Sequence, residues 1–136
     1  MEIISPILVS SFLEDLKLFL QGNTNSVSLI NDIVLIILLF ADDMAIFGNN
    51  PEGLQNNLNL LHDYCNIWRL EVNGDKTKIM VFRKKGLKIE EKWTNNGLSV
   101  EVVDSFNYLG TVFKYNVNFA LNNNFIIGKS LKALNV

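Results

Sequence analysis

Two stretches of the chain repeat apolar residues at the spacing of an amphipathic helix. In the first, we expect the helix to be capped by Ser5, to have Pro6 at its first position and to end near Gly22. Its apolar stripe has spacings of four, four and three: Leu8, Phe12, Leu16 and Phe19. The pattern predicts a helix that packs one face on a core.

The second helical stretch has clearer start signals. Asn50 is a suitable N-cap and Pro51 fits the first helical position. The apolar stripe that follows consists of Leu54, Leu58, Leu61, Cys65 and Trp68. We expect Cys65 and Trp68 to lie in the core. His62, Asp63 and the asparagines are off the stripe, and we expect His62 to be exposed.

Between these helices lies a run that predicts strands. Ile33 to Phe40 is apolar without polar gaps, which is typical of a strand buried on both faces. Ala41-Asp42-Asp43 follows, and then a second apolar run, Met44 to Phe47. The simplest interpretation is a hairpin whose tight turn carries two carboxylates.

After Trp68 the period changes to two, which indicates further strands. Asn73-Gly74 and Asn96-Gly97 are hairpin turn signals. We expect strands at Leu70–Val72, Ile79–Phe82, Ile89–Thr94, Leu98–Val103 and Phe106–Phe113, and a helix at Phe119–Leu134. The sequence therefore predicts an α+β fold with a mainly antiparallel sheet packed on two or three helices.

Composition narrows the function classes. A chain of 136 residues without a dividing linker has the size of one domain, and 49% hydrophobic residues exclude disorder as its default state. A net charge of −2 does not suit a stand-alone nucleic-acid binder. One cysteine and one histidine exclude an internal disulfide, thiolate metal clusters and His-rich zinc sites.

Targeting signals are absent from the sequence. The longest apolar run, Ile33 to Ala41, is far shorter than the roughly 20 residues of a transmembrane helix. Glu2 and Pro6 do not fit a signal peptide. We expect an intracellular protein of the nucleus or cytoplasm, without membrane association.

The carboxylate pair Asp42-Asp43 is the most specific chemical feature. Hard oxygen ligands at a hairpin tip suit Mg²⁺, and phosphoryl-transfer enzymes hold two metal ions roughly 3.5–4 Å apart with such groups. The alternative is that Asp is present because it favours turns. A two-metal site also needs a third carboxylate, and none is identified in this chain.

The string LLFADDMAIF (Leu38 to Phe47) resembles the catalytic hairpin of reverse transcriptases, in which two aspartates follow an aromatic residue and one further residue. Other matches occur in the family's order: Ser5-Pro6 before an apolar helix, PEGLQNNLNLLHDYCNIW, LEVNGDKTKIMVF and FNYLG. The FADD form, the N-x-x-K-T-K-x-M pattern and the YLG string resemble non-LTR, LINE-like retrotransposon polymerases in particular.

This resemblance implies RNA-directed DNA synthesis from dNTPs on an RNA template and a DNA primer. Asp42 and Asp43 would be the catalytic ligands of Mg²⁺, for which Mn²⁺ can substitute, and Phe40 would pack beside the primer terminus. Lys76 would lie near the triphosphate. Tyr108, Leu109 and Gly110 would form a turn that grips the primer.

Alternatives stay open for several of these residues. Lys76 is equally explained as a solvated turn lysine, and Tyr108 and Leu109 as core packing of the last strand. Arg83, Lys84, Lys85 and Lys88 either contact phosphates or form a solvated loop.

The resemblance covers the second half of a polymerase palm. We expect residues 1–113 to form a partial palm domain and residues 114–136 the helical start of the thumb. The family's upstream catalytic aspartate and fingers have no match here, so we expect a fragment that is inactive alone and that self-associates through an exposed palm edge. The alternative is a non-catalytic α+β binding module or a domesticated remnant.

Overall fold

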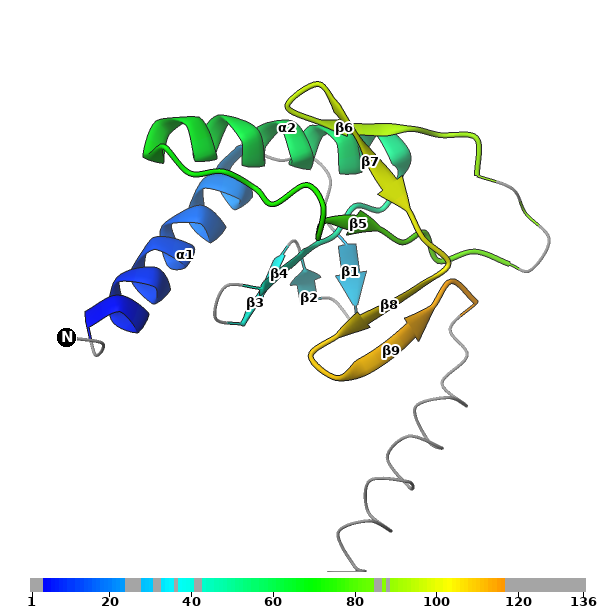
Figure 1. Cartoon of the computed structure of the whole chain (residues 1–136), viewed down its shortest axis with the longest axis horizontal. Helices are drawn as coiled ribbons and strands as arrows, with labels where there is room; N and C mark the ends of the chain where they lie inside the picture. The colour runs from blue at the N-terminus through cyan, green and yellow to red at the C-terminus, as the bar shows by residue number, and fades with distance from the viewer. Residues whose placement is uncertain are drawn as a thin grey trace, which may run out of the picture. The chain divides into compact units, whose positions relative to one another are not determined.

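The computed structural model of the chain describes residues 4–23, 28–30, 33–35, 37–40, 43–84, 87 and 89–116. Within these ranges the elements follow the order α1 (Ile4–Asn23), β1 (Ser28–Ile30), β2 (Ile33–Leu35), β3 (Ile37–Phe40), β4 (Asp43–Ile46), α2 (Pro51–Trp68), β5 (Lys78–Ile79), β6 (Trp93–Asn95), β7 (Leu98–Val102), β8 (Ser105–Tyr108) and β9 (Thr111–Lys114) (Figure 1). The predicted α+β class is confirmed. The helix expected at Phe119–Leu134 lies outside the described residues.

The chain forms two compact units. Unit 1 comprises Met1–Val72 and Glu91–Ser99, and unit 2 comprises Asn73–Glu90 and Val100–Val136. The described strands form pairs β1-β2, β3-β4 and β8-β9 and a three-stranded sheet in the order β5-β7-β6.

The core of unit 1 lies between the two helices and the β3–β4 hairpin. Its buried side chains come from three elements: Leu16 and Leu20 of α1, Ile37 of β3, and Leu61, Tyr64 and Cys65 of α2. The Tyr64 hydroxyl donates a hydrogen bond to Asp15 Oδ2 at 3.1 Å. Burial, together with this bond to a carboxylate, raises the pKa of Tyr64 to about 12, and burial raises the pKa of the Cys65 thiol.

Helix α1 begins two residues earlier than predicted. Ser5 is not its N-cap, because the helix already starts at Ile4. Proline is tolerated throughout the first turn, where backbone N–H groups need no intrahelical partner, so Pro6 does not fix the start. At the other end, Asn23 Nδ2 donates to the Phe19 carbonyl at 2.8 Å.

Helix α2 begins as the sequence predicts. The side chain of Asn50 accepts a hydrogen bond from the Gly53 N–H at 2.7 Å, and Pro51 occupies the first helical position. The helix ends because Arg69 adopts a left-handed conformation with φ of 54°.

Two predictions about α2 are wrong. Trp68 is not in the core, since 51% of its surface is exposed on the last residue of the helix. His62 is half-buried, and its Nε2 lies 3.0 Å from Asn66 Nδ2.

The apolar run from Ile33 to Phe40 is not one strand buried on both faces. It contributes β2, which pairs with β1, and β3, which pairs with β4. Leu38 and Phe40 are 45% and 62% exposed because the β3–β4 pair is only two strands wide and packs a single face on the core. Apolar composition alone therefore overstated the burial of this segment.

Side chains of α2 hold strand β6. The Gln55 amide accepts from the Thr94 N–H at 2.9 Å and donates to the Thr94 carbonyl at 2.9 Å. Buried Trp93 donates through Nε1 to the Pro51 carbonyl at 2.9 Å. Gln55 thus supplies the donor and acceptor that a neighbouring strand would supply.

The hairpin predicted at Asn96-Gly97 is confirmed. Asn96 and Gly97 have φ of 52° and 73°, as a type I′ turn requires, and they join β6 to β7.

The hairpin predicted between Leu70–Val72 and Ile79–Phe82 is wrong. Asn73-Gly74 does begin a turn, but Leu70 donates its N–H to the Cys65 carbonyl at 2.8 Å and so completes the helix end. Beyond the turn, β5 pairs in parallel with β7.

The last predicted strand is instead a hairpin. Phe106 and Phe113 lie opposite each other on antiparallel strands β8 and β9. The chain reverses at Leu109 and Gly110, whose φ values are 51° and 81°.

Candidate active site and nucleic-acid interface

The β3–β4 hairpin carries the described part of the carboxylate pair. Its register places Phe40 opposite Asp43, Leu39 opposite Met44, Leu38 opposite Ala45 and Ile37 opposite Ile46. Asp42 and Ala41 lie between the two strands in the sequence and outside the described residues.

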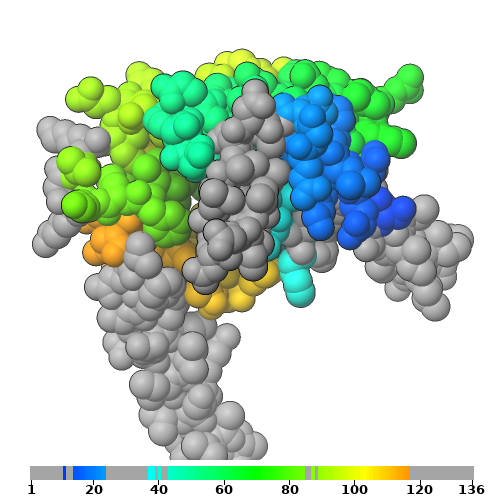
Figure 2. Space-filling view, turned by 180° about the vertical axis from the view of Figure 1, so that it is seen from behind, coloured from blue at the N-terminus to red at the C-terminus, as the bar shows by residue number. Residues whose placement is uncertain are grey.

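The hairpin has one face on the core and one in solvent. Ile37 is buried in the core cluster, and Met44 and Ile46 pack against it. Directly opposed residues share a face of the sheet, so Phe40 and Asp43 lie together on the other face. In Figure 2 the cyan hairpin segment reaches the surface of unit 1 beside α1 in blue.

The Asp43 side chain suits a hard cation. It is exposed at the end of a paired strand, so its oxygens are open to a ligand, and carboxylate oxygen is the donor type that Mg²⁺ prefers. Among the described residues no three His, Cys, Asp or Glu side chains gather into a metal site. What the structure supplies is one strand-anchored carboxylate beside an aromatic ring.

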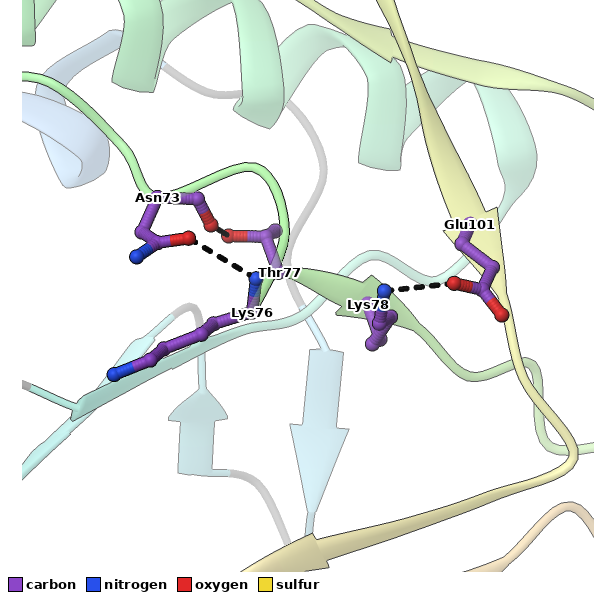
Figure 3. A network of polar contacts seen from close by, with 5 residues as sticks. All are labelled: Asn73, Lys76, Thr77, Lys78 and Glu101. Atoms are coloured by element: carbon purple, nitrogen blue, oxygen red, sulfur yellow. Dashed lines mark hydrogen bonds and ion pairs between the residues drawn. The ribbon is translucent and has the colours of Figure 1, made fainter.

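Lys76 belongs to a tight turn in unit 2. Asn73 Oδ1 accepts from the Lys76 N–H at 3.1 Å, and the Asn73 carbonyl accepts from Thr77 N at 3.0 Å and Thr77 Oγ1 at 2.7 Å (Figure 3). These bonds fix the backbone of Lys76, while its exposed side chain extends away from the neighbouring Lys78–Glu101 ion pair. The backbone is held and the ammonium stays available.

Tyr108, Leu109 and Gly110 meet at the turn between β8 and β9. Tyr108 lies opposite Thr111 and is half-buried. Leu109 is 50% exposed, so the alternative that it packs in the core is wrong. It also adopts a left-handed conformation, which costs a branched residue roughly 1 kcal/mol.

Arg83 is neither a solvated loop residue nor free to bind phosphate. Its Nη2 pairs with Asp104 Oδ1 at 2.7 Å, its Nε donates to the Leu87 carbonyl at 3.0 Å, and its guanidinium lies 4.4 Å from the centre of the Tyr115 ring. The Arg83 N–H donates to the Tyr115 carbonyl at 2.9 Å. The basic sequence around Arg83 gave no sign of this structural role.

Asn57 has a structural role that the sequence does not indicate. Helical spacing places it off the apolar stripe, yet it is fully buried, and its Nδ2 donates to the Phe47 carbonyl at 2.8 Å. No pattern in the sequence distinguishes it from the exposed asparagines beside it.

The described site residues divide between the two units. Phe40 and Asp43 belong to unit 1, and Lys76 and the turn Tyr108–Gly110 belong to unit 2. The structure places Phe40 opposite Asp43, and it places Tyr108, Leu109 and Gly110 in one turn.

The family model described as "Reverse transcriptase (RNA-dependent DNA polymerase)" matches residues 3–113, which include all of the candidate residues above. The chain belongs to the reverse transcriptase family. Reverse transcriptases act on a nucleic-acid template and primer and use divalent metal ions. Comparison with curated proteins and with solved structures finds no match. In the described part of this reverse transcriptase domain, no helix has the length and apolar character needed to cross a membrane.

Proposed function

We propose that the chain carries the second half of a reverse transcriptase palm from a non-LTR, LINE-like element, whose reaction is RNA-directed DNA synthesis from dNTPs. The observation that carries this proposal is the β3–β4 hairpin, which presents Asp43 and Phe40 on one open face within the family match. Residues 1–113 form the partial palm in this proposal, and residues 114–136 begin the thumb. The protein would act in the nucleus or cytoplasm, where its nucleic acids are.

In this proposal Asp42 and Asp43 hold Mg²⁺, for which Mn²⁺ can substitute. The bound ion supplies charge stabilisation at the reacting phosphate. Strand pairing of β4 with β3 fixes the backbone of Asp43, and Phe40 on the same face offers an apolar surface to the primer terminus. Lys76, held by the Asn73 turn, provides positive charge for the departing pyrophosphate.

The strained turn at Leu109 supports a nucleic-acid contact. A type I′ turn strongly favours Asn or Gly at this position, so an exposed leucine there lowers stability without a packing gain. We expect Leu109→Asn to stabilise the hairpin by about 0.5–1 kcal/mol and to weaken binding of a primer–template.

The matched control is Leu98→Asn. Leu98 is 71% exposed and follows the other type I′ turn, outside the proposed primer contact. Fluorescence anisotropy with a labelled RNA–DNA primer–template measures both variants. Equal affinity of Leu109→Asn and the wild type would contradict the primer contact.

A basic segment supports nucleic-acid binding by unit 2. All six charged residues between Asp75 and Glu90 are Lys or Arg, although the chain as a whole has a net charge of −2. Ion pairs engage two of them, Lys78 with Glu101 and Arg83 with Asp104. Lys76 and Lys84 have exposed side chains.

The test of this segment is the salt dependence of binding. Each phosphate contact contributes about −0.9 to the slope of log K against log salt for a duplex. We expect Lys76→Ala or Lys84→Ala to make the slope shallower by about one, and Lys92→Ala, an exposed lysine of unit 1, to leave it unchanged. Unchanged slopes in both variants would contradict binding through this segment.

We also propose that residues 1–136 alone do not extend a primer, because a two-metal site needs a third carboxylate and the described residues gather no such group. The purified chain with primer–template, dNTPs and Mg²⁺ should give no product. Extension that is abolished by Asp42→Asn would overturn this part of the proposal.

Self-association is expected of the same polypeptide. Three large apolar side chains at the end of α2 and just beyond it are exposed: Ile67 at 65%, Trp68 at 51% and Leu70 at 47%. Analytical ultracentrifugation across a concentration series should show association, and a monomer at high concentration would contradict it.

A further inference from the structure

The connection between β4 and α2 is fixed at several points, all within unit 1. Asn57 Nδ2 donates to the Phe47 carbonyl at 2.8 Å, and the Asn57 side chain is fully buried. One residue later, Gly48 lies so close to α2 that an added Cβ would be 2.7 Å from Leu54 N. The Leu54 N–H in turn donates to the Asn50 carbonyl at 3.0 Å.

Phe47 directly follows the strand that begins with Asp43. The distance along an extended strand from Asp43 to Phe47 is about 13 Å, so Asn57 acts on the strand end remote from the carboxylate. Pairing with β3 makes β4 part of a two-stranded ribbon, and restraint at one end therefore limits sliding along its whole length.

Register decides which face carries the carboxylate. Met44 and Ile46 pack on the core, and Asp43 lies on the open face. A shift of β4 by one residue would turn Asp43 towards the core and Met44 towards solvent. A hydrogen bond from the buried helix side of α2 to the strand end opposes that shift.

Burying an amide side chain completely is unfavourable unless its polar atoms are bonded. A leucine would fill a similar volume at position 57 without that cost, but it would leave the Phe47 carbonyl without this donor. The position therefore uses a polar residue to hold the strand rather than to fill the core.

We propose that Asn57 is a positioning residue for the Asp42–Asp43 hairpin: its amide fixes the end of β4 on α2 and so keeps Asp43 on the open face. This inference rests on the proposed metal-binding role of the hairpin. It extends that role to a residue with no metal or nucleic-acid contact of its own.

The main test compares Asn57→Leu with two controls. Asn56→Leu places the same substitution on the adjacent exposed position of α2. Leu58→Ala removes a buried side chain of the same helix that does not belong to the core cluster on which Met44 and Ile46 pack, and so reports the effect of lower stability. The readouts are amide hydrogen exchange across β4 and the Mn²⁺ concentration that half-broadens the Asp43 amide resonance.

We expect Asn57→Leu to accelerate exchange at Ala45, whose N–H faces Leu38 in the hairpin ladder, about tenfold or more. It should also raise the half-broadening Mn²⁺ concentration at least about threefold, since local opening exposes the strand to register shifts. Asn56→Leu and Leu58→Ala should leave the Mn²⁺ midpoint unchanged. An unchanged midpoint in folded Asn57→Leu, or an equal rise in Leu58→Ala, would overturn the inference.

A measurement on the wild type covers the case in which Asn57→Leu does not fold. The Asn57 side-chain amide protons should exchange at least about tenfold more slowly than those of exposed Asn56. Equal exchange rates would show that the hydrogen bond to Phe47 does not restrain the strand. Failure of the wild type to bind Mn²⁺ would contradict the proposed function instead, while leaving these exchange rates interpretable.

Discussion

Replacing Gly48 with alanine should destabilise the protein through a single steric conflict. An ideal Cβ at this position would lie 2.7 Å from the Leu54 nitrogen and 2.8 Å from its Cα and Cβ. Two of these three atoms are backbone, so a rotamer change cannot relieve the contact. The first turn of α2 is also held by the Asn50 cap, which bonds the Gly53 N–H at 2.7 Å.

The magnitude follows from what must move. Overpacking of a well-fitted site costs about 1–3 kcal/mol, because the strand end and the helix start have to separate. With a urea m-value of about 2 kcal/mol/M, the unfolding midpoint should fall by about 0.5–1.5 M. Urea unfolding followed by far-UV circular dichroism measures this shift.

Gly22→Ala provides the matched control. Gly22 lies in α1 with nothing within 4 Å of an added Cβ, so the same substitution should be neutral or should stabilise by up to about 1 kcal/mol. The steric argument would be refuted by a Gly48→Ala midpoint equal to that of the wild type. It would also be refuted if Gly22→Ala were destabilised as much as Gly48→Ala.

Further predictions concern two buried aromatic residues of unit 1. Trp93→Phe removes the hydrogen bond from Nε1 to the Pro51 carbonyl and should lower the free energy of unfolding by about 1–3 kcal/mol. Trp68→Phe, at an exposed position, should lower it by less than about 1 kcal/mol, and the urea midpoints of the two variants test this difference. The pKa of Tyr64 is about 12 in the folded protein, against an unfolded value near 10. The contribution of the protonated hydroxyl to the free energy of unfolding is therefore fully present below pH 10 and is lost as the pH rises towards 12. Relative to Tyr64→Phe, the wild type should therefore lose up to about 2 kcal/mol between pH 9.5 and 12, and parallel stability curves for the two proteins would contradict the assigned cause.

Local signals in the sequence predicted the elements that local interactions determine. Asn50 and Pro51 predicted the start of α2, and Asn96-Gly97 predicted a type I′ turn, because these residues bond or orient their own backbone. The Asp-bearing hairpin was predicted from two apolar runs separated by acidic residues. Its described strands confirm the hairpin, but Asp43 is the first residue of β4 and not part of the turn.

Strand pairing and burial could not be predicted in the same way. The Ile33–Phe40 run looks uniformly buried, but the width of each sheet and the partner on each face are not encoded in hydropathy. The Leu70 N–H looks available to a strand, yet it completes the end of α2. The parallel pairing of β5 with β7 joins segments more than 20 residues apart, and no local pattern indicates it.

The candidate site shows the same division. The motif strings mark Asp42, Asp43 and the turn at Tyr108–Gly110 as candidates, and the structure adds that Leu109 is exposed and strained. Asn57 escaped prediction because its burial depends on the packing of α2 against the end of β4. A buried polar side chain of this kind becomes visible only when its partner is known.

The most direct test of the account is a Mn²⁺ titration of the ¹⁵N-labelled chain followed by NMR. The account predicts that broadening begins at the β3–β4 hairpin, at the amides of Phe40 and Asp43, and that Asp42→Asn or Asp43→Asn abolishes it at the same Mn²⁺ concentrations. Exposed Asp63, in α2, provides the control, and Asp63→Asn should leave the titration unchanged. Broadening that is uniform over acidic surface residues, or that persists in both hairpin variants, would contradict a metal-binding reverse transcriptase hairpin.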